Sequence, residues 1–252
     1  MRKGWTMNNT FDFKRFGQVV AKDWKDYFRS FGIALIVWCS LPILFWISTL
    51  ILDFEMVNGS RSALIGIFVF TTLMFVPSKV YGNANLSREG VSFAMLPATS
   101  TEKFFSMVLY CSVLTPLIVV MGSWAVDSLL TILPFGGFAD FVVFPRIGLG
   151  IGMVLVARVC MVLSVSAIFM FGNMVFTKRK TGKTIAWAML IIFIVTMVLQ
   201  LFNFWEAFGT WVTNTSARLE HRFLIWVYSA FMLVVAILFY SLTYFKIKTQ
   251  KY

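Results

Sequence analysis

Residues 31–52 read FGIALIVWCSLPILFWISTLIL, a run of 22 residues without one charged side chain. An α-helix rises about 1.5 Å per residue, so about 20 residues cross a hydrocarbon core of about 30 Å. Comparable apolar runs cover residues 62–82, 103–126, 147–175, 184–204 and 223–245. The sequence therefore predicts an all-α membrane protein with six transmembrane helices, built as a single domain over residues 1–252.

The 22 lysines and arginines are distributed unevenly about these runs. Seventeen lie on one side, in the N-terminal segment, the second and fourth connections and the C-terminal tail. The opposite side holds only Arg61, Arg146, Arg218 and Arg222. Short basic connections stay in the cytoplasm, so we expect both termini there.

The composition excludes most soluble classes. The chain is 59% hydrophobic and 13% charged, whereas a soluble domain carries about 25% charged residues. A net charge of +11 is compatible with nucleic-acid binding. Because the basic residues flank apolar runs, anionic lipid headgroups are the better partner, and we expect no nucleic acid.

Residues 10–29 precede the first run and have an amphipathic pattern. Aromatic and apolar side chains recur at three- and four-residue spacing, which places them on one helix face: Phe13, Phe16, Val20, Trp24, Tyr27 and Phe28. The lysines and arginines fall largely elsewhere. This pattern is typical of a helix lying on the membrane surface, although a solvated tail is the alternative.

Catalytic chemistry has few candidates in this chain. His221 is the only histidine, and neither a G-x-S-x-G nor an H-E-x-x-H pattern occurs. Residues 181–184, TGKT, resemble the end of a nucleotide-binding P-loop, but position 177 is Thr where that motif needs Gly. We therefore expect no enzyme activity, metal or cofactor in this chain.

Arg158 is the one charge deep inside an apolar run. It lies 11 residues past Ile147, about 16 Å along the helix. A charge at the bilayer centre costs at least about 2.5 kcal/mol, so it should face protein or water. Asp127, at the outer end of the third run, is the nearest candidate partner. Arg158 therefore has two interpretations, a structural polar contact or part of a substrate pathway.

The second connection, residues 83–102, is unusually long and reads NANLSREGVSFAMLPATSTE. Thr99 and Glu102 have the spacing of a capping box, which predicts that the third helix begins there. Residues 95–104, MLPATSTEKF, resemble the L-P-x-[ST]-x-x-E-K-F segment of permease-like proteins from Bacteroidetes-type bacteria. With the layout of the whole chain, this resembles the permease subunit of an ABC-2-type (type V) ABC transporter.

The resemblance implies a role for each cytoplasmic segment. Residues 10–29 would be the connecting helix, and residues 83–102 would be the coupling loop that docks on a separate ABC ATP-binding subunit. The coupling residues would be Asn85, Arg88, Glu89, Thr99, Glu102 and Lys103. ATP would bind to that partner, and a second permease copy, identical or not, would complete the unit. The expected function is export of a lipid, glycan, peptide or drug-like substrate across the bacterial inner membrane.

A second function class competes with the permease. The chain could be a non-transporting accessory or sensor protein beside a transporter, and an intramembrane enzyme is a third class. A transporter predicts polar groups facing a pathway within the membrane helices. Ser and Thr also serve ordinary helix packing, so their presence alone does not separate these classes.

Overall fold

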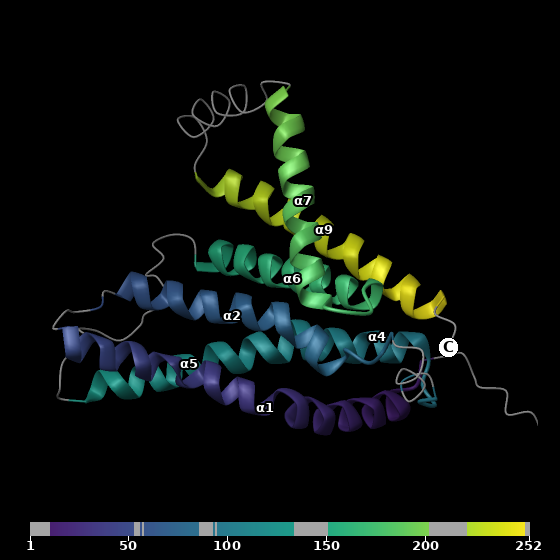
Figure 1. Ribbon diagram of the computed structural model, residues 1–252, viewed down its shortest axis with the longest axis horizontal. Coiled ribbons are helices and arrows are strands. Elements are labelled where there is room, and N and C mark those ends of the chain that lie inside the picture. The colour runs from purple at the N-terminus through teal and green to yellow at the C-terminus, as the bar shows by residue number, and fades with distance from the viewer. Residues whose placement is uncertain are drawn as a thin grey trace, which may run out of the picture.

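The computed structural model describes residues 11–52, 56, 58–85, 93, 95–133, 151–201 and 221–249. The regular elements in this part of the chain are helices (Figure 1). They are α1 (Phe13–Leu52), α2 (Asn58–Val80), α4 (Ser100–Val108), the π-helix η1 (Leu109–Leu114), α5 (Thr115–Ile132), α6 (Ile151–Val175), α7 (Lys180–Leu201) and α9 (His221–Thr249). The stretch α4–η1–α5 is continuous along the chain, so it forms one long helical rod.

Five helical stretches are long and apolar enough to cross a membrane. They are Phe13–Leu52, Ser60–Val80, Ser100–Ile132, Leu155–Val175 and Ile225–Thr249. They coincide with five of the six predicted runs, which confirms a helical multi-pass architecture. Helix α7 occupies the remaining run but is not among these five, so the sixth crossing stays a prediction.

Contacts between helices fix their relative directions. The hydroxyl of Ser164 donates to the carbonyl of Met232, and Ser166 bonds to Tyr240, so α6 and α9 run side by side in the same direction. Arg61 at the start of α2 contacts Asp127 near the end of α5, so these two helices are antiparallel. Figure 1 shows α1 and α4–α5 running one way and α2, α6 and α9 the other.

One end of the bundle therefore collects the starts of α1 and α4 and the ends of α2, α6 and α9 (Figure 1). Basic residues gather there: Lys14, Arg15, Lys22, Lys25, Lys79, Lys103, Lys178, Arg179, Lys180, Lys246 and Lys248. We call this the basic end. The asymmetry seen in the sequence is thus a property of the folded bundle.

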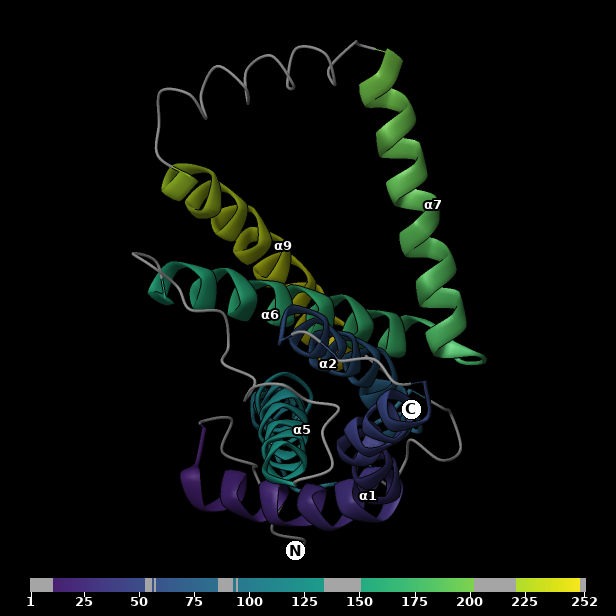
Figure 2. The ribbon, with the colours of Figure 1, turned by 90° about the vertical axis from the view of Figure 1, so that its left-hand side faces the viewer.

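Helix α1 differs from the prediction of a separate surface helix before the first span. Residues 13–52 form one helix of 40 residues without a break at residue 30. Its two halves nevertheless run in different directions: in Figure 2 the N-terminal half lies across the view, and the C-terminal half is seen nearly end-on.

The predicted aromatic face of this N-terminal half is divided. Tyr27 is fully buried, together with Val19 and Asp23 one turn apart, whereas Trp24 and Phe28 are exposed. The prediction placed all the aromatic side chains on one membrane-facing surface. It was wrong for Tyr27, because the same helix also packs against α4 and η1.

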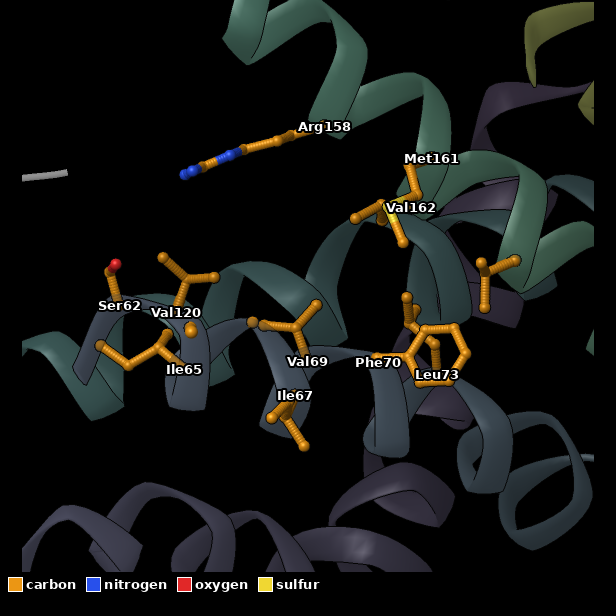
Figure 3. A pocket seen from close by; sticks show the side chains of 13 residues that line it. Ser62, Ile65, Ile67, Val69, Phe70, Leu73, Val120, Arg158, Met161 and Val162 are labelled. Atoms are coloured by element: carbon orange, nitrogen blue, oxygen red, sulfur yellow. The ribbon is translucent and has the colours of Figure 1, made fainter. Parts of the chain in front are cut away.

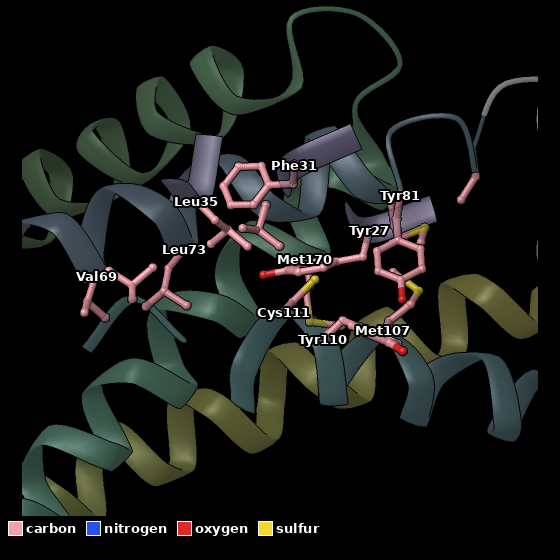
Figure 4. Close-up of a cluster of buried hydrophobic side chains, with 14 of the residues drawn as sticks. Tyr27, Phe31, Leu35, Val69, Leu73, Tyr81, Met107, Tyr110, Cys111 and Met170 are labelled. Carbon is pink, nitrogen blue, oxygen red and sulfur yellow. The ribbon is translucent and has the colours of Figure 1, made fainter. Parts of the chain in front are cut away.

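The core lies where α1, α2, η1 and α6 meet (Figure 4). Its largest buried side chains include Tyr27, Leu73, Tyr110 and Met170. Lipid tails are as apolar as these side chains, so close packing rather than water exclusion holds membrane helices together. Gly122 illustrates this, since a Cβ there would lie 2.5 Å from Cys39 Sγ.

Candidate functional site

The start of the predicted coupling loop is bonded to the connection between α6 and α7. The Asn85 side-chain amide donates to the carbonyls of Met174 at 3.1 Å and Phe176 at 2.9 Å. Its carbonyl oxygen accepts from Lys180 Nζ, which also donates to the Gly82 carbonyl. We call these contacts the Asn85–Lys180 joint.

Lys180 is largely buried in this joint, with 8% of its surface exposed. Burial disfavours the charged ammonium and lowers the pKa of Lys180 to about 8. A neutral amine still has two N–H donors, which matches the two oxygen atoms that Nζ contacts. Lys180 can therefore keep both contacts as an ammonium or as a neutral amine, and burial disfavours the ammonium.

The far end of the predicted coupling loop is fixed by Glu102. The capping box with Thr99 is confirmed: the Glu102 N–H donates to Thr99 Oγ1, and the Thr99 N–H donates to Glu102 Oε2 at 2.9 Å. The same carboxylate accepts from the Asp12 N–H at 2.9 Å and pairs with Arg15 at 3.2 Å. Glu102 is fully buried, so it ties the start of α1 to α4 rather than presenting a surface to a partner.

The other predicted coupling residues divide into two groups. Lys103 is also turned inward, because its Nζ donates to the Phe93 carbonyl at 2.8 Å and lies 5.2 Å from the centre of that ring. Arg88 and Glu89 lie outside the described residues. A contact with a partner through these two positions therefore stays a prediction.

Asp127 is brought together with Arg61, which sequence analysis did not pair with it. Arg61 Nε donates to Asp127 Oδ1 at 3.0 Å, and its Nη2 contacts Oδ2 and, at 3.1 Å, Thr131 Oγ1. Both charged side chains are almost fully buried. The suggested partnership of Asp127 with Arg158 is thus replaced. The sequence did hold a signal for this pair. Arg61 precedes the second run and Asp127 follows the third, so both lie on the same side of the membrane.

Arg158 lines a cavity of about 610 Å³ between α2, α5 and α6 (Figure 3). Helix α2 contributes the side from Ser62 to Leu73, α5 contributes Val120, and α6 contributes Arg158 to Val165. Apart from Ser62 and Arg158, the lining residues are apolar or glycine. Ligand pockets have this volume and character, mostly apolar with a few placed polar groups. We call it the Arg158 cavity.

A cluster of three hydroxyl groups lies beside this region, where η1 meets α6 and α9. The hydroxyls of Ser112, Ser166 and Tyr240 lie 2.6–2.7 Å from one another. Each hydroxyl can donate one bond and accept another, so the ring satisfies these polar groups inside the apolar bundle. Sequence analysis missed the cluster, because no pattern joins residues so far apart.

Comparison with known proteins gives no further assignment. No protein family, curated protein or solved structure matches this chain. Among the residues that the structure describes, no three His, Cys, Asp or Glu side chains are placed to hold a metal ion. The Arg158 cavity and the two attached ends of the predicted coupling loop are therefore the features that bear on function.

Proposed function

We propose that this chain is the membrane-spanning permease subunit of an ABC-type exporter in the bacterial inner membrane. A separate ATP-binding subunit supplies the energy, and a second permease copy completes the transporter. The proposal begins from the likeness of residues 95–104 to the permease segment described above. The observation that carries it is the attachment of the coupling loop at both ends.

The attachments give the loop the mechanical connections that a coupling element needs. Asn85 fastens one end to the α6–α7 connection, and Glu102 fastens the other end to the start of α1. The two contacts span sequence separations of about 90 residues. A subunit that displaces this loop would therefore act on α1, α6 and α7 together, and α6 borders the Arg158 cavity.

The chain direction supports six crossings. Helices α6 and α9 run in the same direction, so α9 begins at the end opposite to where α6 finishes. The chain must therefore return between them to the end where α9 begins. Its helix α7 has 22 residues, about 33 Å in length, which suffices for one crossing. In Figure 1, α7 stands at a steep angle to α6 and α9, so the proposal requires it to align with them as the sixth crossing. The basic end with both termini is then cytoplasmic.

Copurification tests the proposal. The chain, tagged at its C-terminus, is purified from native membranes in mild detergent, and copurifying proteins are identified. We expect a stoichiometric P-loop ATPase, which is lost when Arg88→Glu and Glu89→Lys are combined. Lys178→Glu, a charge reversal in the other basic connection, is the matched control and should retain the ATPase. A preparation of the unaltered chain without an ATPase contradicts the proposal and favours an accessory protein.

A further inference from the structure

The Arg158 cavity is amphipathic along its length. Ser62 and Arg158 lie at one end, and Phe70, Leu73 and Val165 lie at the other. Ser62 and Leu73 are 11 residues apart on α2, about 16 Å. Figure 3 shows the Arg158 guanidinium extending from α6 toward the end where Ser62 lies. The cavity thus has one cationic end and a long apolar remainder.

The charge of Arg158 is available to a ligand. Within the described residues it forms neither an ion pair nor a hydrogen bond, and its side chain is exposed. Arg61, next to Ser62, is also cationic but is neutralised by the buried carboxylate of Asp127. Arg158 therefore has no counter-charge among the residues that the structure describes.

A charge at membrane depth is costly unless a counter-charge or water is present. A guanidinium forms its strongest contacts with carboxylate and phosphate groups, which it can bind through two parallel N–H donors. The remainder of the cavity offers hydrocarbon contacts and little else. The complementary ligand is therefore an acyl chain that ends in an anionic group.

We propose that the Arg158 cavity binds an acyl-chain anion, with its carboxylate or phosphate on Arg158 and its chain between α2 and α6. As a transport substrate this ligand rests on the proposed function. Binding itself requires no ATPase, so it is measured on the purified chain alone. The anionic headgroup binds at the end of the cavity remote from the basic end, and the acyl chain extends toward the middle of the bundle.

Gly66 provides a steric test of the same cavity. It lines the cavity, and a Cβ added there meets nothing within 4 Å. A phenylalanine at this position would occupy the part of the cavity that the acyl chain fills in the proposal, without displacing the protein backbone. Gly17, on the exposed face of α1, is equally open, so Gly17→Phe is a control for the same chemical change outside the cavity.

The experiment measures binding of dansyl-undecanoate, a fluorescent fatty-acid analogue, to the chain in phosphatidylcholine nanodiscs. Arg158→Gln should weaken binding about tenfold, as expected for one lost charge-assisted contact. Arg158→Lys should retain part of it. The uncharged methyl ester should bind the unaltered chain and Arg158→Gln alike. Gly66→Phe should weaken both probes, and Gly17→Phe neither.

Competition identifies the source of the anion. Displacement of the probe by oleate indicates a free fatty acid, and displacement by phosphatidylglycerol in the nanodisc indicates a membrane lipid. Either result supports the proposal if Arg158→Gln weakens the displacement in proportion to its effect on the probe. Equal affinity of the unaltered chain and Arg158→Gln for the charged probe overturns it, as does undiminished binding by Gly66→Phe. Neither result depends on whether an ATPase copurifies.

Discussion

The guanidinium of Arg61 and the carboxylate of Asp127 form a buried ion pair that joins the start of α2 to the end of α5. Thr131 takes a further N–H of the arginine at 3.1 Å. The pair fixes the relative register of two antiparallel helices at the end of the bundle remote from the basic end. It also leaves Arg158 as the cation that faces the cavity.

Removing one member of the pair should destabilise the protein strongly. Arg61→Met leaves the Asp127 carboxylate buried without its partner, which typically costs about 3–5 kcal/mol. Asp127→Leu should have a similar effect on Arg61. The double variant should recover most of the loss, because no uncompensated charge remains. Thermal unfolding in detergent measures all three, and a double variant no better than the singles contradicts this account.

Glu102 should control the order of the first turn of α1. Glu102→Ala leaves the Asp12 and Thr99 N–H groups without their acceptor, at a cost of about 1–3 kcal/mol. Hydrogen exchange of residues 11–16 should therefore accelerate. Asp26→Ala is the control, because its 3.5 Å pair with Lys22 is solvent-exposed and worth little. Unchanged exchange in Glu102→Ala would show that other contacts hold this segment.

The Asn85–Lys180 joint should make stability depend on pH. Burial lowers the pKa of Lys180 from 10.5 to about 8, so between these values the folded chain binds fewer protons than the unfolded chain. The contribution of Lys180 to stability then rises with pH across this window and is constant below it. Lys180→Arg stays charged throughout. The difference in Tm between the unaltered chain and Lys180→Arg should grow from pH 8 to 10, and parallel curves would refute it.

Gly122 and Gly66 should respond oppositely to the same substitution. Gly122→Ala places a Cβ 2.5 Å from Cys39 Sγ, and such overpacking costs about 1–3 kcal/mol. Gly66→Ala meets open space and should be neutral or stabilising by up to about 1 kcal/mol, since alanine favours helix. Combining Gly122→Ala with Cys39→Ala should relieve the clash. Thermal unfolding distinguishes these outcomes.

Apolar runs and local motifs carried most of the fold prediction. The capping box at Thr99 and Glu102 located the start of α4 to the residue, because a cap depends only on near neighbours in sequence. The run at 31–52 ends where α1 ends, at Leu52. The sequence analysis divided this helix in two near residue 30. Neither a proline nor a turn sequence occurs there, and the helix continues without a break.

The candidate site was far less accessible from the sequence. Arg158 stood out because a charge in an apolar run is visible without a fold. The cavity beside it depends on the spacing of α2 and α6, which no local pattern records. Asn85 was expected to face a partner, yet its amide bonds to carbonyls about 90 residues away. Glu102 has two roles in one carboxylate, and the motif revealed only the local one.

The unbroken course of α1 has a mechanical consequence. Its two halves run in different directions but belong to one continuous helix, so they can act together as a bent lever arm. Glu102 accepts a hydrogen bond from Asp12 at the start of the N-terminal half, and Cys39 in the C-terminal half packs closely against Gly122 of α5. A sideways displacement of the start of α1 would therefore tilt its C-terminal half within the bilayer.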